Sequence, residues 1–344
     1  MDHKGTVTLE TEHLILRRFT LRDADAMFRN LYSDAEAIRY LPWDTHANIA
    51  ETEAHLTGYI TEYKHKDYYA WAIVLKGPNE PIGFISAAVD ETINAVKVDY
   101  GVGKLWWHKG YTSNALSELI RFSFEEVQAN RVYATHDPRN PNSGKVMEKC
   151  GMIYEGTLRQ ARHRKGEYSD RAMYAILKED WNTKKEIMYY DELPCHFQDF
   201  IEVPTLSNGE IYLVCVEKQP GSQEKKLVPG YEFAVCKNGE RIGRINLRIG
   251  YCDKLYYGGQ IGYDINEAHR GNDYAGQACR LLLPVAKAHK MEKLLITNDI
   301  DNTASKRVCE KLGARLVRVA RLPEWHDLYI RGGRFSNIYE WNVL

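Results

Sequence analysis

The feature that most limits how this chain can fold is an internal repeat. The stretch WHKGYTSNAL, residues 107–116, has a counterpart in HRGNDYAGQA, residues 269–278. The aligned pairs are Gly110 with Asp273, Tyr111 with Tyr274, Ala115 with Ala278, Asn140 with Asn302, Ser143 with Ser305, and Gly151 with Gly313. The offset is 163 residues for the first three pairs and 162 for the others. A period this long indicates a duplicated domain and not a solenoid of short repeats.

The length of the chain agrees with two domains, since 344 residues exceed a typical single domain. We place the boundary near residue 182, at the start of the charged segment NTKKEIMYYDELP. The N-terminal domain is then 1–182 and the C-terminal domain 183–344. The front of the second domain is shorter, because EKQPGSQEKKLVPG leaves little room for two helices between its first two strands.

Apolar periodicity predicts the same order of elements in both halves. In the first half we expect helices over 21–34, 49–64, 112–129 and 141–150, and strands within 68–89, 95–103, 131–137 and 171–181. In the second half we expect strands within 210–221, 230–250, 258–265 and 293–299, and helices over 276–290 and 303–312. Alternating strands and helices predict an α/β fold built on a mixed sheet, present twice.

Composition excludes several classes of protein. The formal net charge is −1, so nothing favours nucleic acid as a partner. The apolar runs are too short for a membrane span, and the N-terminus resembles no secretory signal. The seven cysteines form no CxxC pair and the twelve histidines no HExxH motif, so we expect no metal site. Scattered single cysteines are typical of a reducing compartment, and we expect a cytoplasmic protein.

The repeated turn predicts an anion site. A strand that enters a helix through small residues directs free backbone N–H groups and the positive end of the helix dipole at one point. Diphosphate is a common occupant of such a site, and glycine lets it approach closely. A purely structural turn would have the same sequence, so this motif alone does not decide the function.

The segments downstream of each turn narrow the interpretation. DPRNPNSGKVMEKCGM and DIDNTASKRVCEKLGA each place an Asn three residues before a Ser and a Gly eight residues after it. With the turns RGNDYA and WHKGYT, this ensemble resembles the GNAT superfamily of acyl-CoA-dependent N-acetyltransferases, whose turn reads Q/R-x-x-G-x-G/A. The first half is similar to the branch that acetylates ribosomal proteins. In the second half the resemblance covers roughly 230–320, and Asp273 replaces the motif's glycine.

The resemblance implies two GNAT-like acyl-CoA N-acyltransferase domains in tandem, each with a sheet that splays after its fourth strand. It further implies acetyl-CoA as the acyl donor, bound through its diphosphate at the turn and its pantetheine along the splayed strand. The implied cofactor-binding residues are His108, Lys109, Gly110, Tyr111, Thr112, Asn140 and Ser143, and in the second half Arg270, Gly271, Asn272, Asp273, Tyr274, Ala275, Asn302 and Ser305.

Two residues are candidates for proton transfer. Family members often carry a glutamate on the fourth strand, where this chain has Lys97 and Gln260, and Asp99 follows two residues after Lys97 on the same strand face. Asp99 is therefore a candidate base, with a solvated edge charge as the alternative. The family's tyrosine acid is replaced by Met147 and Cys309. Cys309 is a candidate acid, with a buried core thiol as the alternative.

Asp273 is the sharpest departure from the family's turn. An ionised carboxylate beside a diphosphate is repelled by about 4 kcal/mol at about 4 Å in an intermediate dielectric. We expect the side chain to cap the following helix, with an outward orientation as the alternative. The flanking His108, Lys109, His269 and Arg270 either contact phosphate or are solvated.

The favoured function is an acetyl-CoA-dependent N-acetyltransferase that acts on a primary amine, either a protein N-terminus or a small molecule, by direct attack on the thioester. The alternative is an acyl-CoA-binding or interaction module in which one or both halves are catalytically silent. The acceptor, the active half and the oligomeric state stay open, a homodimer among the alternatives.

Overall fold

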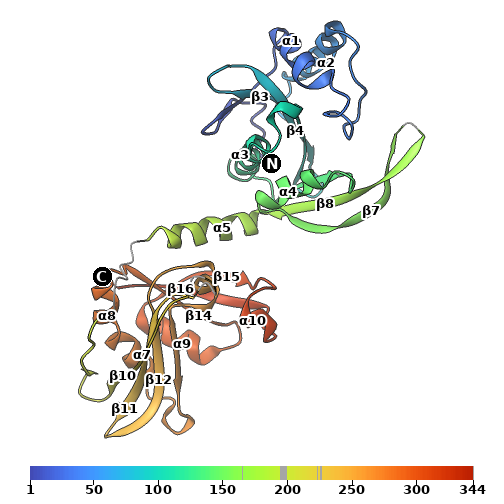
Figure 1. The fold of residues 1–344 in the computed structure, drawn as a ribbon. Helices are drawn as coiled ribbons and strands as arrows, with labels where there is room; N and C mark the ends of the chain where they lie inside the picture. Colours follow the sequence, from blue (N-terminus) through green and yellow to red (C-terminus); the bar gives the residue numbers. More distant parts are fainter. Residues whose placement is uncertain (165, 194–199, 223, 225–226, 344) are drawn as a thin grey trace. The chain divides into compact units, whose positions relative to one another are not determined.

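The computed structural model describes residues 1–164, 166–193, 200–222, 224 and 227–343. The chain divides into two compact units, Met1–Asn182 and Thr183–Leu344. Each unit has a separate eight-stranded sheet and its own hydrophobic core (Figure 1). We refer to them as unit 1 and unit 2.

The sheet of unit 1 is mixed, in the order β1-β2-β3-β4-β5-β6-β8-β7. Its strands are β1 (Leu9–Glu10), β2 (Leu14–Arg17), β3 (Tyr69–Leu75), β4 (Pro81–Asp90), β5 (Ala95–Val102), β6 (Arg131–His136), β7 (Ile153–Arg164) and β8 (Glu167–Leu177). All neighbours are antiparallel except β5 and β6, which are parallel. β7 and β8 form a long hairpin at one edge, which extends beyond the other strands (Figure 1).

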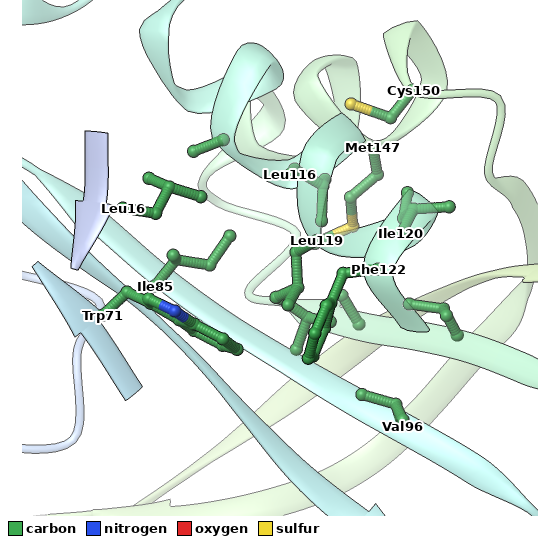
Figure 2. Packing of buried hydrophobic residues seen from close by; sticks show 14 of the residues in the cluster. Leu16, Trp71, Ile85, Val96, Leu116, Leu119, Ile120, Phe122, Met147 and Cys150 are labelled. Carbon is green, nitrogen blue, oxygen red and sulfur yellow. The ribbon is translucent and has the colours of Figure 1, made fainter. Parts of the chain in front are cut away.

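Two groups of helices cover the two faces of this sheet. The long amphipathic helix α3 (Tyr111–Glu125) and α4 (Pro141–Lys149) pack on one face, over Trp71, Ile85 and Val96 (Figure 2). The elements at the front are η1 (Leu21–Asp23), α1 (Ala24–Met27), η2 (Phe28–Tyr32) and α2 (Ile49–Glu62). They pack on the opposite face with Ala72, Val74 and Phe84, because neighbouring residues of a strand point to opposite sides.

The sheet of unit 2 repeats that of unit 1 strand by strand, in the order β9-β10-β11-β12-β13-β14-β16-β15. Its strands are β9 (Leu206–Ser207), β10 (Tyr212–Gln219), β11 (Gly230–Lys237), β12 (Glu240–Arg248), β13 (Ile261–Ile265), β14 (Lys293–Asp299), β15 (Arg315–Arg321) and β16 (Phe335–Asn342). The parallel pair is again the central one, β13 with β14. The predicted duplication of an α/β mixed-sheet fold is confirmed.

One of the two helices predicted in unit 2 is divided in the structure. The single helix predicted over 276–290 is two helices, α7 (Tyr274–Leu281) and α8 (Leu283–Ala288). Pro284 stands in the first turn of α8, where its missing N–H is tolerated, but in the middle of a longer helix it would remove a hydrogen bond. The prediction over 303–312 is confirmed by α9 (Thr303–Leu312), and short helices α6 (Asp253–Gly258) and α10 (Asp327–Ile330) complete the unit.

The prediction near the boundary was wrong in its details. The strand predicted over 171–181 ends at Leu177, and residues Lys178–Asp191 form the helix α5. Asp180 accepts a hydrogen bond from the backbone N–H of Leu177 at 3.1 Å, so a carboxylate stabilises the first turn. Trp181 packs against the core of unit 1, and Tyr190 is buried in unit 2. These apolar contacts are why a charged segment becomes a helix here.

Candidate active site

The central feature of unit 1 is a cleft where β5 and β6 separate. The two strands pair through three positions, from Ala95 opposite Arg131 to Lys97 opposite Tyr133, and pairing ends there. A cavity of about 910 Å³ opens beyond this point, lined by residues of both strands, the turn before α3, the start of α4 and the loop 40–43. Such a gap leaves backbone groups of both strands unpaired, so an extended ligand can hydrogen-bond to them.

The turn before α3 has the conformation that an anion site needs. Gly110 is the N-cap of α3 with φ +82°, and a Cβ at this position would meet no other atom within 4 Å. His108 also has a positive φ, +61°. Three of the predicted phosphate-site residues, His108, Gly110 and Thr112, line the cavity. Lys109 is exposed and Tyr111 packs against the core, and neither is among the lining residues.

The residues at the start of α4 lie on the same cavity. Asn140 is the N-cap of α4, but its side chain makes no capping bond. Tyr100, from β5, donates from its hydroxyl to the carbonyl of Ser143 at 3.1 Å and so ties the diverging strand to α4. Asn140 and Ser143 both line the cavity. Their side chains are therefore available to a ligand in the cleft.

Asp99 lies on the face of β5 that points away from α3 and α4 and toward the front helices. Its side chain is 53% exposed and its Oδ2 lies 3.4 Å from the Nζ of Lys97. Both residues line the cavity. Tyr59 and Phe84 share this part of the lining with the loop that carries Trp43, so the YLPW stretch, 40–43, is part of the wall. The cleft thus has an apolar front wall with one carboxylate and one ammonium group.

An aromatic cluster stands behind this front wall. The ring of His55 lies 4.9 Å from that of Trp43 and 5.2 Å from that of Tyr59, measured between centroids. Burial and the neighbouring His46 lower the pKa of His55 to about 4, so the ring is neutral at pH 7. Burial also raises the pKa of Tyr59 to about 12. The rings of His55 and Tyr59 are therefore uncharged near neutrality.

His136, at the end of β6, is a site residue that sequence reasoning missed. It is buried and lines the cavity. Its Nδ1 lies 2.8 Å from the carbonyl of Asp137, so Nδ1 carries the proton and, in the neutral ring, Nε2 is an acceptor. Among the residues that the structure describes, Nε2 has no hydrogen-bond partner. Gly144 of α4 leaves room for the ring, because a Cβ there would lie 2.9 Å from Nε2.

The corresponding turn of unit 2 has the same backbone but a different chemistry. Asp273 is the N-cap of α7 with φ +59°, so it adopts the left-handed conformation of Gly110. The carboxylate does not make the capping bond that we predicted. It lies 3.3 Å from Lys311 Nζ and 3.5 Å from Arg280 Nη1, and Gly276 provides the space for it. A negative charge therefore stands at the turn, neutralised by two side chains of the same unit.

Arg270, predicted to bind the cofactor, braces the turn. Its Nε donates to the carbonyl of Ile265 at 2.9 Å, and its Nη2 lies 3.6 Å from Asp264. Trp107, the aligned residue of unit 1, donates from Nε1 to the carbonyl of Val102 at 2.8 Å. Trp107 and Arg270 thus each donate to the carbonyl of the last residue of the strand before the turn, which is β5 in unit 1 and β13 in unit 2.

The other predicted residues of unit 2 are held by their own neighbours. Asn302 caps α9 by accepting from the N–H of Ser305 at 3.0 Å, and the hydroxyl of Ser305 lies 2.8 Å from that of Tyr263. Asn272 donates to the carbonyls of His269 and Arg270. Tyr274 contacts the ammonium of Lys237, Ala275 packs against the core, and Gly271 has a positive φ like His108.

Cys309 lies in the hydrophobic core of unit 2. It is fully buried, and the amide of Asn298 donates to its sulfur at 3.7 Å. Burial raises the pKa of its thiol to about 12. Met147, the aligned residue of unit 1, is buried in the first core (Figure 2). These surroundings are those of a packing residue, and they do not support Cys309 as a proton donor.

Gln260, which directly precedes β13, is also structural. It is fully buried, its Nε2 donates to the carbonyl of Gly250 at 3.0 Å, and its Oε1 accepts from the N–H of Leu295. Within the described residues, no group of three or more His, Cys, Asp or Glu side chains could hold a metal ion. None of the helices described here is both long and apolar enough to cross a bilayer.

Comparison with known proteins identifies the class. The acetyltransferase (GNAT) domain family matches residues 13–153 and 167–315, and the chain belongs to this family. It is an N-acetyltransferase with two GNAT regions, as expected from the resemblance of the turns and the Asn-x-x-Ser segments to this family.

Several relatives match half of this chain and nearly all of their own. An uncharacterised N-acetyltransferase, p20, of Bacillus licheniformis is 27% identical over 51% of this chain and 98% of its own length. The alanine N-acetyltransferase of ribosomal protein uS5 from Escherichia coli is 28% identical over 51% of this chain and 93% of its own. A GNAT-family acetyltransferase structure from Bacillus anthracis is 26% identical and covers 50% of this chain and 99% of its own, with a TM-score of 0.45.

Proposed function

We propose that unit 1 holds acetyl-CoA in the cleft between β5 and β6 and transfers the acetyl group to a primary amine that enters from the front wall. The observation that carries this proposal is the single cavity that joins the Gly110 turn, the start of α4 and Asp99. One end of that cavity suits a diphosphate and the other an amine. The relative from E. coli, an alanine N-acetyltransferase of ribosomal protein uS5, supports an amine acceptor.

The donor's diphosphate would bind the backbone N–H groups of the turn at the N-terminus of α3. The left-handed Gly110 has no Cβ to obstruct the approach of phosphate oxygens. The side chains of Asn140 and Ser143 and the Nε2 of His136 would hydrogen-bond to the pantetheine arm. Lys145 and Lys149 of α4 line the same cavity and would attract the phosphate groups.

Transfer itself requires a neutral amine, which attacks the thioester carbonyl and expels the CoA thiolate. The amine loses one proton and the thiolate gains one, so no net charge is created. Asp99 would hold the incoming ammonium group and accept its proton, and the apolar wall of Trp43, Tyr59 and Phe84 would exclude water. The thiolate needs no strong acid, because its pKa is close to that of free cysteine, about 8.5.

Unit 2 would not bind the donor in the same manner. Asp273 places a carboxylate at the turn where the diphosphate would lie, and Ser305 and Asn302 are already bonded within the unit. We therefore assign donor binding and chemistry to unit 1. A structural role for unit 2 follows from this assignment.

The test is turnover of acetyl-CoA by the full-length chain against a panel of primary amines, followed by release of free CoA thiol and by the mass of the product. We expect acetylated amine and free thiol in equal amounts. Asp99→Asn should lower kcat by about 10- to 100-fold, at or below the low end of general-base effects because Asp99 is half exposed, and leave the KM for acetyl-CoA unchanged. Donor binding without transfer to any amine would contradict the proposal and favour a binding module.

A further inference from the structure

Two arginines on the acceptor side of the unit 1 cleft lack counter-ions. Arg162 of β7 and Arg171 of β8 are half-buried and line the cavity. Within the described part of the chain, neither lies within ion-pair distance of a carboxylate. Arg162 donates to the carbonyl of Tyr40 at 2.9 Å, and no described residue accepts a hydrogen bond from Arg171. Burial lowers the pKa of Arg171, which shows that its guanidinium is partly desolvated.

The neighbouring arginines are different, because each is satisfied. Arg139 forms an ion pair with Asp137 at 2.7 Å. Arg164 lies 2.9 Å from Asp44 and donates to the carbonyls of Leu41 and Trp43. These bonds fix the loop 40–44 against the β7–β8 hairpin. The hairpin therefore holds this loop through Arg164 and through one bond of Arg162, while Arg162 and Arg171 line the cavity without an ion-pair partner among the described residues.

Arg39 adds a third guanidinium at the mouth of the cleft. It is exposed, lies over the ring of Tyr40 at 5.7 Å from its centroid, and lines the same cavity as Arg162 and Arg171. Arg39 and Arg162 also line an adjoining cavity of about 430 Å³. A desolvated cation without a partner is unfavourable, and a bound anion relieves this. The site is therefore complementary to a negative group.

Asp99 lies close enough for its charge to act on Arg171. The carboxylates of Asp137 and Asp99 both raise the pKa of Arg171 against the effect of burial. Register explains this proximity, because Arg171 and Asp99 both point away from the face covered by α3 and α4. One wall of the acceptor site thus suits an ammonium group and the opposite wall suits an anion.

We propose that the acceptor is a small amine that also carries an anionic group, a carboxylate or a phosphate, a few bonds from its nitrogen. Arg171 and Arg162 bind the anion, and the planar fork of Arg171 suits a bidentate contact. Asp99 receives the ammonium group at the other wall. The pinned loop 40–44 restricts the space, which favours a small acceptor over a folded protein terminus. This inference rests on the proposed acetyl transfer by unit 1.

The experiment uses matched pairs of acceptors with the full-length chain. One arm compares amino acids with their amides, and the other compares aminoalkyl phosphates with the corresponding amino alcohols. Free N-terminal peptides with amidated C-termini form a third arm. The value of kcat/KM for each amine is measured from thiol release at saturating acetyl-CoA. We expect the anionic member to exceed its neutral partner at least tenfold in one of the first two arms, and that arm identifies the anion.

Variants test which arginines bind the anionic group of the acceptor. Arg171→Gln and Arg162→Gln should each reduce the anionic-to-neutral ratio at least fivefold and leave the KM for acetyl-CoA unchanged. Arg171→Lys should retain part of the ratio, because a point charge lacks the fork. Arg159→Gln, on the same strand as Arg162 but exposed and outside the cavity lining, is the matched control and should leave the ratio unchanged.

The possible failures are distinct. Equal or better turnover of the neutral members or of the amidated peptides would overturn this inference and leave acetyl transfer in place. The same conclusion would follow if Arg171→Gln and Arg162→Gln both left the ratio unchanged. No turnover of any amine would overturn the proposed function, and this inference with it. The comparison of acceptors with the unmodified protein needs no variant, so misfolding of a variant does not obscure the result.

Discussion

The two units share one fold and differ in where their polar groups find partners. At the Gly110 turn of unit 1 an added Cβ would meet no described atom within 4 Å, whereas unit 2 places the carboxylate of Asp273 at its turn, near Lys311 and Arg280. At the end of the central strand, the Nε2 of His136 has no partner among the described residues, and its counterpart Asn298 accepts from Asn337 at 2.8 Å. In unit 2, polar groups at these positions bond to neighbours within the unit, whereas in unit 1 we expect a ligand to take the place of those neighbours.

The same contrast holds at the start of the following helix. The side chain of Asn140 makes no capping bond, but that of Asn302 does. Tyr100 bonds the backbone of Ser143, but Tyr263 bonds the side chain of Ser305. Because these pairs are aligned and the backbones match, the difference is one of side-chain chemistry and not of fold. In a duplicated domain, hydrogen bonds between the site's own side chains can take the place of bonds to a ligand.

The largest effect is expected from exchanging the turn residues. Gly110→Asp places the residue of unit 2 in unit 1, and Asp273 shows that aspartate can adopt this left-handed conformation. We expect acetyl-CoA affinity to fall at least 100-fold, since like charges at about 4 Å repel by up to about 4 kcal/mol at an intermediate dielectric. Gly110→Asn, which tolerates the same backbone without charge, should lose much less. Calorimetry with acetyl-CoA checks both variants.

The reciprocal change sharpens this result. Asp273→Gly removes the carboxylate from unit 2 but leaves Asn302, Ser305 and Asn298 bonded to their neighbours. We therefore expect no second tight site for acetyl-CoA. A second site of equal affinity would show that Asp273 alone prevents acetyl-CoA from binding to unit 2.

A smaller effect is expected at His136. His136→Leu removes the free acceptor and should weaken acetyl-CoA binding about tenfold, which corresponds to one hydrogen bond of about 1.4 kcal/mol. His136→Gln retains an acceptor at similar reach and should stay within about threefold of the unmodified protein. Unchanged affinity in both variants, with a lowered melting temperature for His136→Leu, would make this histidine part of the core and not of the binding site.

The counterpart change in unit 2 should affect stability instead of turnover. Cys309→Ala removes a fully buried thiol from the second core. We expect a loss of about 1–2 kcal/mol in the unfolding free energy and a kcat within about twofold of the unmodified protein. A tenfold loss of kcat in a folded variant would show that Cys309 is the proton donor and that the chemistry takes place in unit 2.

The smallest effect is a pH dependence confined to unit 1. The folded-state pKa of His55 is about 4, below its ordinary value of 6.5, so the unfolded chain binds a proton first as the pH falls. Stability is then full above about pH 6.5 and decreases as the pH falls toward 4. His55→Gln should flatten the dependence of the unit 1 melting temperature on pH over this range. Equal slopes in both proteins would show that His55 is not the group responsible.

Much of this organisation could be predicted from the sequence, because the offset of 162–163 residues fixes the fold of one half from the other. The boundaries were less predictable where tertiary contacts decide. Pro284 divides the helix predicted over 276–290, and Trp181 and Tyr190 stabilise a helix at the charged segment where we placed the domain boundary. To predict that a proline begins a new helix, or that an aromatic residue is buried, one must know how the segment packs in the fold.

The site was predicted unevenly for a related reason. Gly110 and Asn140, implied by the family resemblance, and Asp99, two residues after the family's glutamate position, all line the cavity. The orientation of Asp273 could not be predicted, since Arg280 and Lys311 are 7 and 38 residues away in the sequence. His136 and Arg171 carry no motif. Among the described residues the Nε2 of His136 and the guanidinium of Arg171 have no hydrogen-bond partner, and only the folded surroundings reveal this.

The most direct test of the difference between the units is the stoichiometry of acetyl-CoA binding to the full-length chain by isothermal titration calorimetry. We predict one equivalent bound per chain, in unit 1. Two equivalents of comparable affinity, or one equivalent that survives Gly110→Asp unchanged, would contradict this account.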